Sequence, residues 1–171
     1  MAEAYLSYAE ALNESSERMS HKQEILDNLN KIRHRAGIAE YGTGTDENGF
    51  TRIKINFSDQ KEVRRLIHKE RRVEFVGEGV RYHDLRRWKT AHYGIGNLNE
   101  QGENPDWGVN GPDYGMNYYG TEYTDKGDNA FFKRTKYMDR VYPRKFYWYP
   151  IHQSEIDKDP TLVKGPFWLG E

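Results

Sequence analysis

The chain has 171 residues, a length that suits one globular domain with its own core rather than two independent domains. Charged residues make up 31% of the sequence, but the formal net charge is −1, so no long-range field would gather nucleic acid. The sequence contains no cysteine, which excludes disulfides, thiolate metal sites and cysteine catalysis, and no apolar run approaches the ~20 residues that span a bilayer.

The first two predicted helices are expected to form an antiparallel pair of the tetratricopeptide type. Residues 2–13 place Ala4, Tyr8 and Ala11 at helical spacing, and we expect this face to receive a neighbouring helix. The second helix is predicted to begin at Ser20, where Ser20 and Gln23 form a capping-box pattern, and to end at Gly37. A repeat of about 34 residues is not evident within this sequence.

A connection rich in glycine, threonine and asparagine follows over residues 41–57, with a possible short strand at 53–55. A third helix is predicted over residues 58–76. After a break at the glycines within 77–79, a fourth helix is expected to continue to about residue 90.

Residues 93–149 hold eight of the 16 glycines and nine of the 13 tyrosines without a sustained period. Because disordered segments are poor in aromatic residues, this composition predicts a long ordered loop region. Its acidic residues precede its basic ones, so an acidic loop could face a basic one. Residues 145–151 are predicted to be extended, with the aromatic residues of 146–149 in the core, and one helical turn is predicted over 153–157.

Two carboxylates interrupt the apolar stripe of the third helix. At about 100° per residue, Glu70 and Glu74 fall on the same side as the apolar residues Val63, Leu66, Ile67 and Val73. A buried carboxylate without a partner costs several kcal/mol, so each is expected to meet a cation. We predict that both pair with Arg81 of the next helix and that this structural ion network extends to Asp84, Arg86 and Arg87. Under this prediction, Glu74→Ala should destabilise the fold by ~3–5 kcal/mol.

The same two glutamates could instead be the acid pair of a glycoside hydrolase, since retaining enzymes hold two carboxyls ~5–5.5 Å apart. The many arginines nearby argue against this, because they would keep both groups ionised and leave no protonated acid. A nucleic-acid site on the basic segment 61–89 is also disfavoured, because its interleaved acidic residues would repel phosphate.

Four segments resemble a known protein family, in the same order along the chain. Residues 70–88, ERRVEFVGEGVRYHDLRRW, are similar to the pattern E-R-R-x-E-x-x-x-E-G-x-R-x-x-D-L-R-R of the SusD/RagB family. The opening AEAYLSYAEALNE, the segment LNKIRHRAG at 29–37 and the segment YPIHQSEI at 149–156 resemble three further motifs of that family. His152 stands where the family usually has proline.

The resemblance implies a mainly α fold, with tetratricopeptide-like helical pairs as the scaffold and a long irregular, aromatic-rich loop region that carries the ligand site. It predicts that the chain is the C-terminal part of such a domain, with a helical scaffold over 1–91, the loop region over 92–149 and a tail over 150–171. It also implies a non-catalytic, glycan-binding lipoprotein at the outer-membrane surface, which passes nutrients to a SusC-like TonB-dependent transporter. The lipid anchor would lie outside this chain, which we expect to be a fragment.

Sugar rings stack on aromatic side chains, and their hydroxyls need paired donors and acceptors. The loop region supplies both kinds, so we predict a ligand site from Trp107, Tyr114, Tyr118, Tyr119, Tyr123, Asp106, Asp113 and Asn117, with Asn110 and Asp128 nearby. The alternatives are a helical protein-interaction module that binds no sugar and, less favoured, a hydrolase. No cofactor is implied. Residues 125–129 lack the ligand pattern of a good calcium loop, and the histidines form no metal motif.

Overall fold

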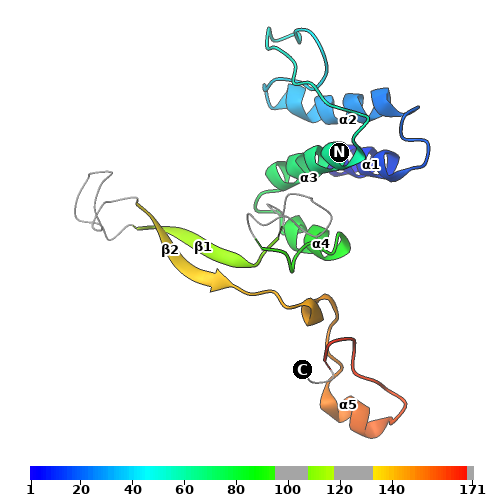
Figure 1. The fold of residues 1–171 in the computed structure, drawn as a ribbon, viewed down its shortest axis with the longest axis vertical. Coiled ribbons are helices and arrows are strands. Elements are labelled where there is room, and N and C mark those ends of the chain that lie inside the picture. Colours follow the sequence, from blue (N-terminus) through cyan, green and yellow to red (C-terminus); the bar gives the residue numbers. More distant parts are fainter. Residues whose placement is uncertain (95–107, 118–132, 169–171) are drawn as a thin grey trace. The chain divides into compact units, whose positions relative to one another are not determined.

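The computed structural model describes residues 1–94, 108–117 and 133–168, which divide into two compact units, Met1–Arg81 and Tyr82–Glu171. Three helices make up the first unit: α1 (Ala2–Glu14), α2 (Lys22–Arg35) and α3 (Gln60–Glu74). The second unit contains α4 (Val80–Arg87, which begins just before the boundary), a two-stranded hairpin of β1 (Gly111–Asn117) and β2 (Lys133–Arg140), a short 3-10 helix η1 (Arg144–Tyr147) and α5 (Gln153–Lys158). The fold is mainly α, as predicted (Figure 1).

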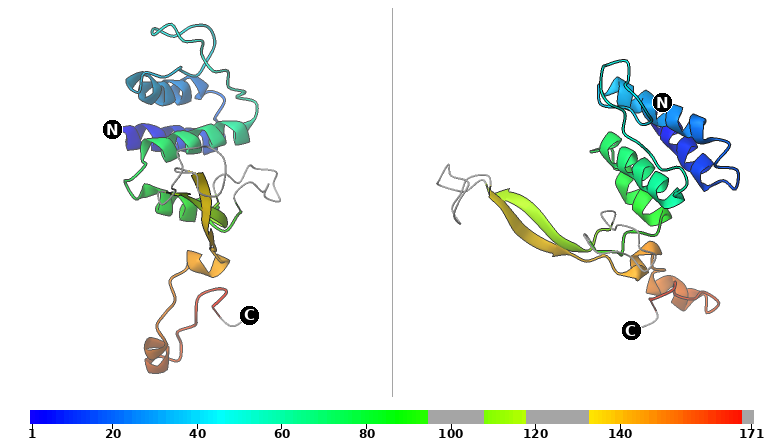
Figure 2. Two further views of the ribbon diagram at one scale, coloured as in Figure 1. Left: turned by 90° about the vertical axis from the view of Figure 1, so that its left-hand side faces the viewer. Right: turned by 45° about the horizontal axis from the view of Figure 1, so that its top comes forward.

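In the first unit, α1 packs against both α2 and α3 (Figures 1 and 2). The short link between α1 and α2 makes this pair antiparallel, as the sequence predicts. The side chains that pack between the helices and are fully or almost fully buried are Leu6, Ala9, Leu12, Ile25, Leu29, Ile32, Val63, Ile67 and Phe75. This apolar cluster fixes the helices and holds the connection after α2 against them through Tyr41.

The predicted contact face of α1 is wrong. Tyr8 is 48% exposed, and Ala4 and Ala11 are also exposed. The buried positions of α1 are instead Leu6, Ala9, Leu12 and Asn13, which form a different face of the helix. In α3, Val73 is likewise exposed, whereas Val63 and Ile67 are fully buried.

The helix ends agree with the sequence in part. The Asp59 side chain caps α3 by accepting hydrogen bonds from the backbone amides of Lys61 and Glu62. The predicted capping box at Ser20 is wrong: α2 begins at Lys22 with His21 as its N-cap, and the Ser20 hydroxyl donates to the Glu17 carbonyl instead. The break after α3 is correct, since two glycines there adopt a positive φ.

The second unit departs most from the prediction. Two segments of the expected loop region pair as antiparallel strands, with Gly111 opposite Arg140 and a register shift after Asp113. A small cluster of Leu85, Ala91 and Tyr142 is buried here. The helical turn at α5 is confirmed, and the His152 side chain caps it by accepting from the Ser154 amide.

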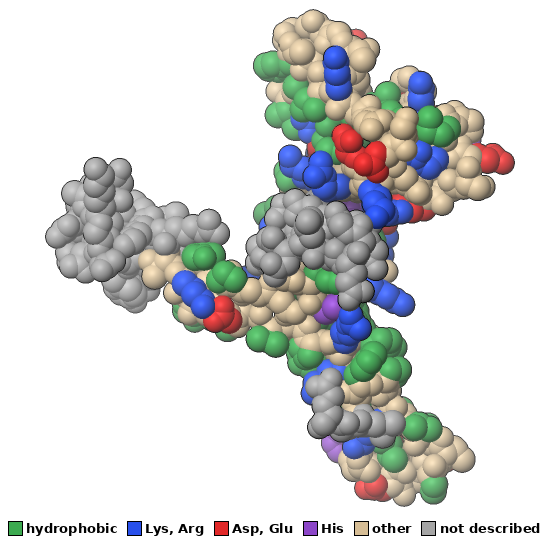
Figure 3. All heavy atoms as spheres, in the orientation of Figure 1, with side chains coloured by type: hydrophobic (Ala, Val, Ile, Leu, Met, Phe, Trp, Pro, Cys, Tyr) green, Lys and Arg blue, Asp and Glu red, His purple; other side chains and the backbone are tan. Residues whose placement is uncertain are grey.

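The aromatic segment before α5 was expected to be extended and buried. Residues 144–147 form η1 instead, and the rings of Phe146 and Tyr147 both contact Tyr142 of the small cluster edge-on. Phe146 is 42% exposed and Tyr149 is 74% exposed. Figure 3 shows such hydrophobic side chains at the surface of the C-terminal segment.

Candidate functional site

Glu70 is buried beside two partners from outside its own helix. It accepts a hydrogen bond from the Tyr41 hydroxyl at 2.8 Å and forms an ion pair with Arg33 of α2. The Arg33 guanidinium also lies over the Tyr41 ring, 4.3 Å from its centroid. Burial, followed by the nearby charge of Glu70, raises the pKa of Tyr41, so this hydroxyl stays protonated and donates. Arg33, Tyr41 and Glu70 are all buried, so this cluster is best explained as part of the structural core.

Glu74 lies one turn further along α3 and pairs with Arg35, whose side chain is 63% exposed. Because Glu70 is buried, the inward orientation predicted for it is confirmed. The predicted partner, Arg81, is wrong for both glutamates, since Glu70 pairs with Arg33 and Glu74 with Arg35. The sequence argument considered only the helix that follows α3. In the structure, the cations come from the C-terminal turn of α2, where the positive charges of Arg33 and Arg35 also interact favourably with the negative end of the helix dipole.

The remaining members of the predicted ion network form separate contacts in the second unit. Asp84 pairs with Arg87 at 2.9 Å, three residues along the same helix. Arg86 donates to the Tyr82 hydroxyl and to the Tyr147 carbonyl, each at 2.6 Å. The Asp84–Arg87 and Arg86–Tyr82 contacts lie within α4, and the bond from Arg86 to the Tyr147 carbonyl joins α4 to η1.

Of the residues predicted to bind ligand, the structure describes two with their side chains. Tyr114 in β1 is 45% exposed. Its neighbour Asp113 forms a cross-strand ion pair with Arg140 at 2.6 Å, a single instance of the predicted acidic-to-basic pairing. Asn117 ends β1. Its side chain and the residues Trp107, Asp106, Tyr118, Tyr119, Tyr123, Asp128 and 125–129 lie outside the described part of the chain.

Asn110, also considered for the ligand site, is used by the fold. Its amide nitrogen donates to the His92 carbonyl at 2.6 Å, and its oxygen accepts from the Tyr142 amide. It thereby joins the start of the hairpin to the segment after α4.

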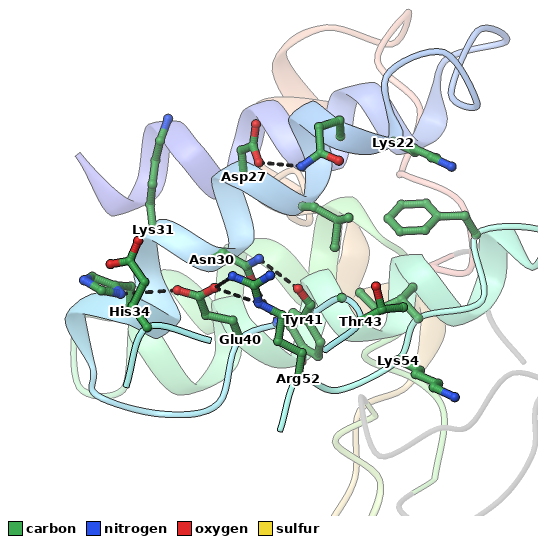
Figure 4. A pocket seen from close by; sticks show the side chains of 16 residues that line it. Lys22, Asp27, Asn30, Lys31, His34, Glu40, Tyr41, Thr43, Arg52 and Lys54 are labelled. Carbon is green, nitrogen blue, oxygen red and sulfur yellow. Dashed lines mark hydrogen bonds and ion pairs between the residues drawn. The ribbon is translucent and has the colours of Figure 1, made fainter. Parts of the chain in front are cut away.

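A pocket that the sequence did not predict lies in the first unit, between α2 and the connection over residues 40–57 (Figure 4). Its volume is about 870 Å³, within the range of small-molecule sites. The α2 wall consists of Lys22, Gln23, Leu26, Asp27, Asn30, Lys31 and His34, and the facing wall of Glu40, Tyr41, Gly42, Thr43, Glu47, Arg52, Lys54, Ile55 and Phe57. The spacing of the α2 residues marks one face of a helix, a signal that a search for ligand sites could have used.

Hydrogen bonds hold the facing wall in one shape. Asn30 accepts from the Tyr41 amide at 2.8 Å and donates to the Tyr41 carbonyl at 2.9 Å, so it pairs with the connection as a neighbouring strand would. Within the connection, the Asp46 carboxylate accepts from three backbone amides, those of Glu40, Asn48 and Phe50. The pocket is therefore preformed.

One end of the pocket is closed by a charged cluster. Glu40 is 7% exposed and accepts from Arg52 at 2.9 Å, while its other oxygen lies 3.2 Å from a ring nitrogen of His34 (Figure 4). Asp27 accepts from Gln23 at 2.8 Å. These groups are occupied by one another, which leaves other residues of the pocket to meet a ligand.

The SusD family model matches residues 1–168. The chain belongs to the SusD family. Its fold agrees: a SusD-like protein from Bacteroides fragilis NCTC 9343 superposes with a TM-score of 0.63 at 24% identity over 98% of this chain. A second solved structure, BT4246, gives a TM-score of 0.61 at 27% identity, also over 98% of this chain.

This SusD-family chain spans about a quarter of both solved structures, 25% of the first and 23% of the second. Among curated proteins, no significant match is found. No helix in the described ranges is long and apolar enough to cross a membrane. Within those same ranges, no group of three or more histidine, aspartate or glutamate residues is placed to hold a metal ion.

Proposed function

We propose that this protein is a non-catalytic glycan-binding subunit at the bacterial outer-membrane surface, which delivers its ligand to a SusC-like TonB-dependent transporter. The observation that carries the proposal is the family match over almost the whole chain. In this view the chain is the C-terminal part of a larger SusD-like domain that is held at the surface by an N-terminal lipid anchor.

The state of Glu70 supports a role without catalysis. A glycoside hydrolase needs one carboxylic acid that gives up its proton and a second carboxylate that reaches the sugar. Glu70 is 5% exposed and is occupied by Arg33 and Tyr41, so it has no access to a substrate. Glu74 is engaged by a different arginine. The two glutamates are therefore better explained as part of the scaffold.

The aromatic hairpin supplies a surface for sugar. Tyr114 in β1 is 45% exposed, and exposed tyrosine offers both a ring face and a hydroxyl. The predicted ligand residues Tyr118, Tyr119 and Tyr123 lie between the two strands in the sequence, outside the residues that the structure describes.

The experiment is affinity electrophoresis of the purified protein through gels that contain individual polysaccharides, together with an assay for newly formed reducing ends. We expect retardation by at least one polysaccharide and no release of reducing ends. Retardation by none, with binding to extended peptides instead, would favour the protein-interaction module. Reducing-end release that disappears in Glu70→Gln would establish a hydrolase and overturn the proposal.

A further inference from the structure

The pocket of the first unit contains two lysines that the scaffold does not use. Lys22 lies at the start of α2, and Lys54 lies on the facing wall (Figure 4). Both side chains are exposed, and neither has a hydrogen bond or ion pair among the residues that the structure describes. Figure 4 draws both side chains to the right of Glu40 and Arg52, Lys22 from α2 and Lys54 from the facing wall.

The other charged groups of the pocket either have partners or lie apart. Arg52 is paired with Glu40, Asp27 is hydrogen-bonded to Gln23, and the Lys31 ammonium sits 4.6 Å from the centroid of the Tyr5 ring. Glu47, an exposed residue of the connection, is the one acidic side chain of the lining for which the described contacts include no partner. Among the described contacts, the lining therefore has two cations without a partner, Lys22 and Lys54, and one such anion, Glu47.

An apolar strip accompanies the two lysines. Leu26 of α2 and Ile55 and Phe57 of the connection line the pocket, and all three are partly buried. A pyranose ring could lay its C–H face on the Phe57 ring and on these aliphatic groups, while a charged substituent of the ring reached the ammonium groups. A neutral sugar would gain only the first of these contacts.

We propose that this pocket is a subsite for an acidic sugar, a pyranose that carries a carboxylate, with the carboxylate held by Lys22 and Lys54 and the ring packed on Phe57. The proposal rests on the proposed glycan-binding function and adds to it the class of sugar. It also places the subsite on the helical scaffold, whereas the sequence analysis placed the ligand site in the aromatic loop region.

The test compares an oligogalacturonate with its fully methyl-esterified form, in which a neutral methyl ester replaces each carboxylate. Isothermal titration calorimetry would be run on the protein and on the double variant Lys22→Ala/Lys54→Ala. The matched control is Lys69→Ala, which removes an exposed lysine of α3, outside the pocket. We expect the acid to bind more tightly than the ester. Two exposed ion pairs predict about a fivefold to tenfold loss of affinity for the acid in the double variant, and no more than about a twofold change in the control.

Screening by salt gives a second readout, because the preference for the acid should shrink toward the affinity of the ester as the ionic strength rises to about 1 M. Equal binding of acid and ester, or an unchanged affinity in the double variant, would overturn the subsite while leaving neutral-glycan binding intact. If the acid, the ester and every neutral polysaccharide all failed to bind, the proposed function itself would be rejected. An equal loss in Lys69→Ala would assign the effect to net charge and overturn the subsite.

Discussion

Arg33 of α2 and Glu70 of α3 form an ion pair in the interior of the first unit, with only 10% and 7% of their side chains exposed. The two residues are 37 positions apart in the sequence, and the Tyr41 hydroxyl donates a further hydrogen bond to Glu70. A buried ion pair is a weak source of net stability, but it penalises any packing that separates the partners. We infer that this contact sets the register of α3 against α2.

Removing Glu70 should therefore be costly. In Glu70→Ala the Arg33 charge stays buried without its counterion, and we expect the free energy of unfolding to fall by about 3–5 kcal/mol in urea titrations. The double variant Arg33→Met/Glu70→Met should recover most of this loss, since it leaves no unpaired charge. A loss below about 0.5 kcal/mol in Glu70→Ala would show that the pair is not structurally important.

Glu74→Ala is the matched comparison one turn away. The sequence argument assigned Glu74→Ala a loss of ~3–5 kcal/mol, but Arg35 is mostly exposed and can return to water when Glu74 is removed. We expect a loss of about 0–1 kcal/mol, the range of a surface ion pair. If both variants lost the same free energy, the distinction between a buried and a surface pair would fail.

The sequence predicted the helices and the inward position of Glu70 because both follow from periodicity within one helix. The partner of Glu70 comes from α2, and periodicity contains no information about which neighbouring helix supplies a cation. The hairpin was missed for a related reason: β1, with the sequence GPDYGMN, has two glycines and a proline, and its pairing partner is separated from it by 15 residues.

Asn30 should control the shape of the pocket wall. Its side chain is the partner of both the amide and the carbonyl of Tyr41, a buried residue, so Asn30→Ala leaves two backbone groups unpaired. We expect a loss of about 1–3 kcal/mol and faster hydrogen exchange at the Gly42 and Ile53 amides, which are bonded within the connection. Gln23→Ala, on the exposed part of the same helix face, is the control and should leave these exchange rates unchanged.

Glu14 should make the first unit sensitive to acid. The Arg64 guanidinium donates to both of its oxygens, at 2.6 and 2.7 Å, and this hydrogen bonding is the main cause of the lowered pKa of the Glu14 carboxyl. Because the pKa is lower in the folded state, the contribution to stability is present above the unfolded-state pKa of about 4.3 and is lost as the pH falls through the folded-state pKa.

The variant Arg64→Met should abolish that contribution, so the stability difference from the parent protein should shrink as the pH is lowered from 6 to 3. Circular dichroism during urea unfolding at several pH values would measure it. Since Glu14 is partly exposed, we expect a small effect. A stability difference that grew toward low pH would contradict the assigned direction of the pKa shift.

The pocket illustrates what a sequence pattern leaves out of a site. Lys22 and Lys54 belong to different elements, and they line one cavity because Asn30 and the buried Tyr41 hold the connection against α2. Composition drew attention to the tyrosine-rich region instead, where charge and aromatic residues are close in sequence. A search for cationic residues on the exposed face of α2 would have found one wall, but the second wall depends on the tertiary fold.

Tyr114 offers the sharpest test of the aromatic hairpin. It is 45% exposed in β1, so Tyr114→Ala should change the unfolding free energy by less than about 0.5 kcal/mol. If its ring stacks on sugar, the same variant should lose roughly 0.5–1.5 kcal/mol of binding energy, or about twofold to twelvefold in affinity for the polysaccharide that retards the parent protein. Tyr137→Ala removes a more exposed tyrosine of the partner strand that was not predicted to bind, and serves as the control. Full affinity in Tyr114→Ala would remove this residue from the ligand site, whereas a loss accompanied by an equal fall in stability would mean that the ring supports the hairpin rather than the ligand.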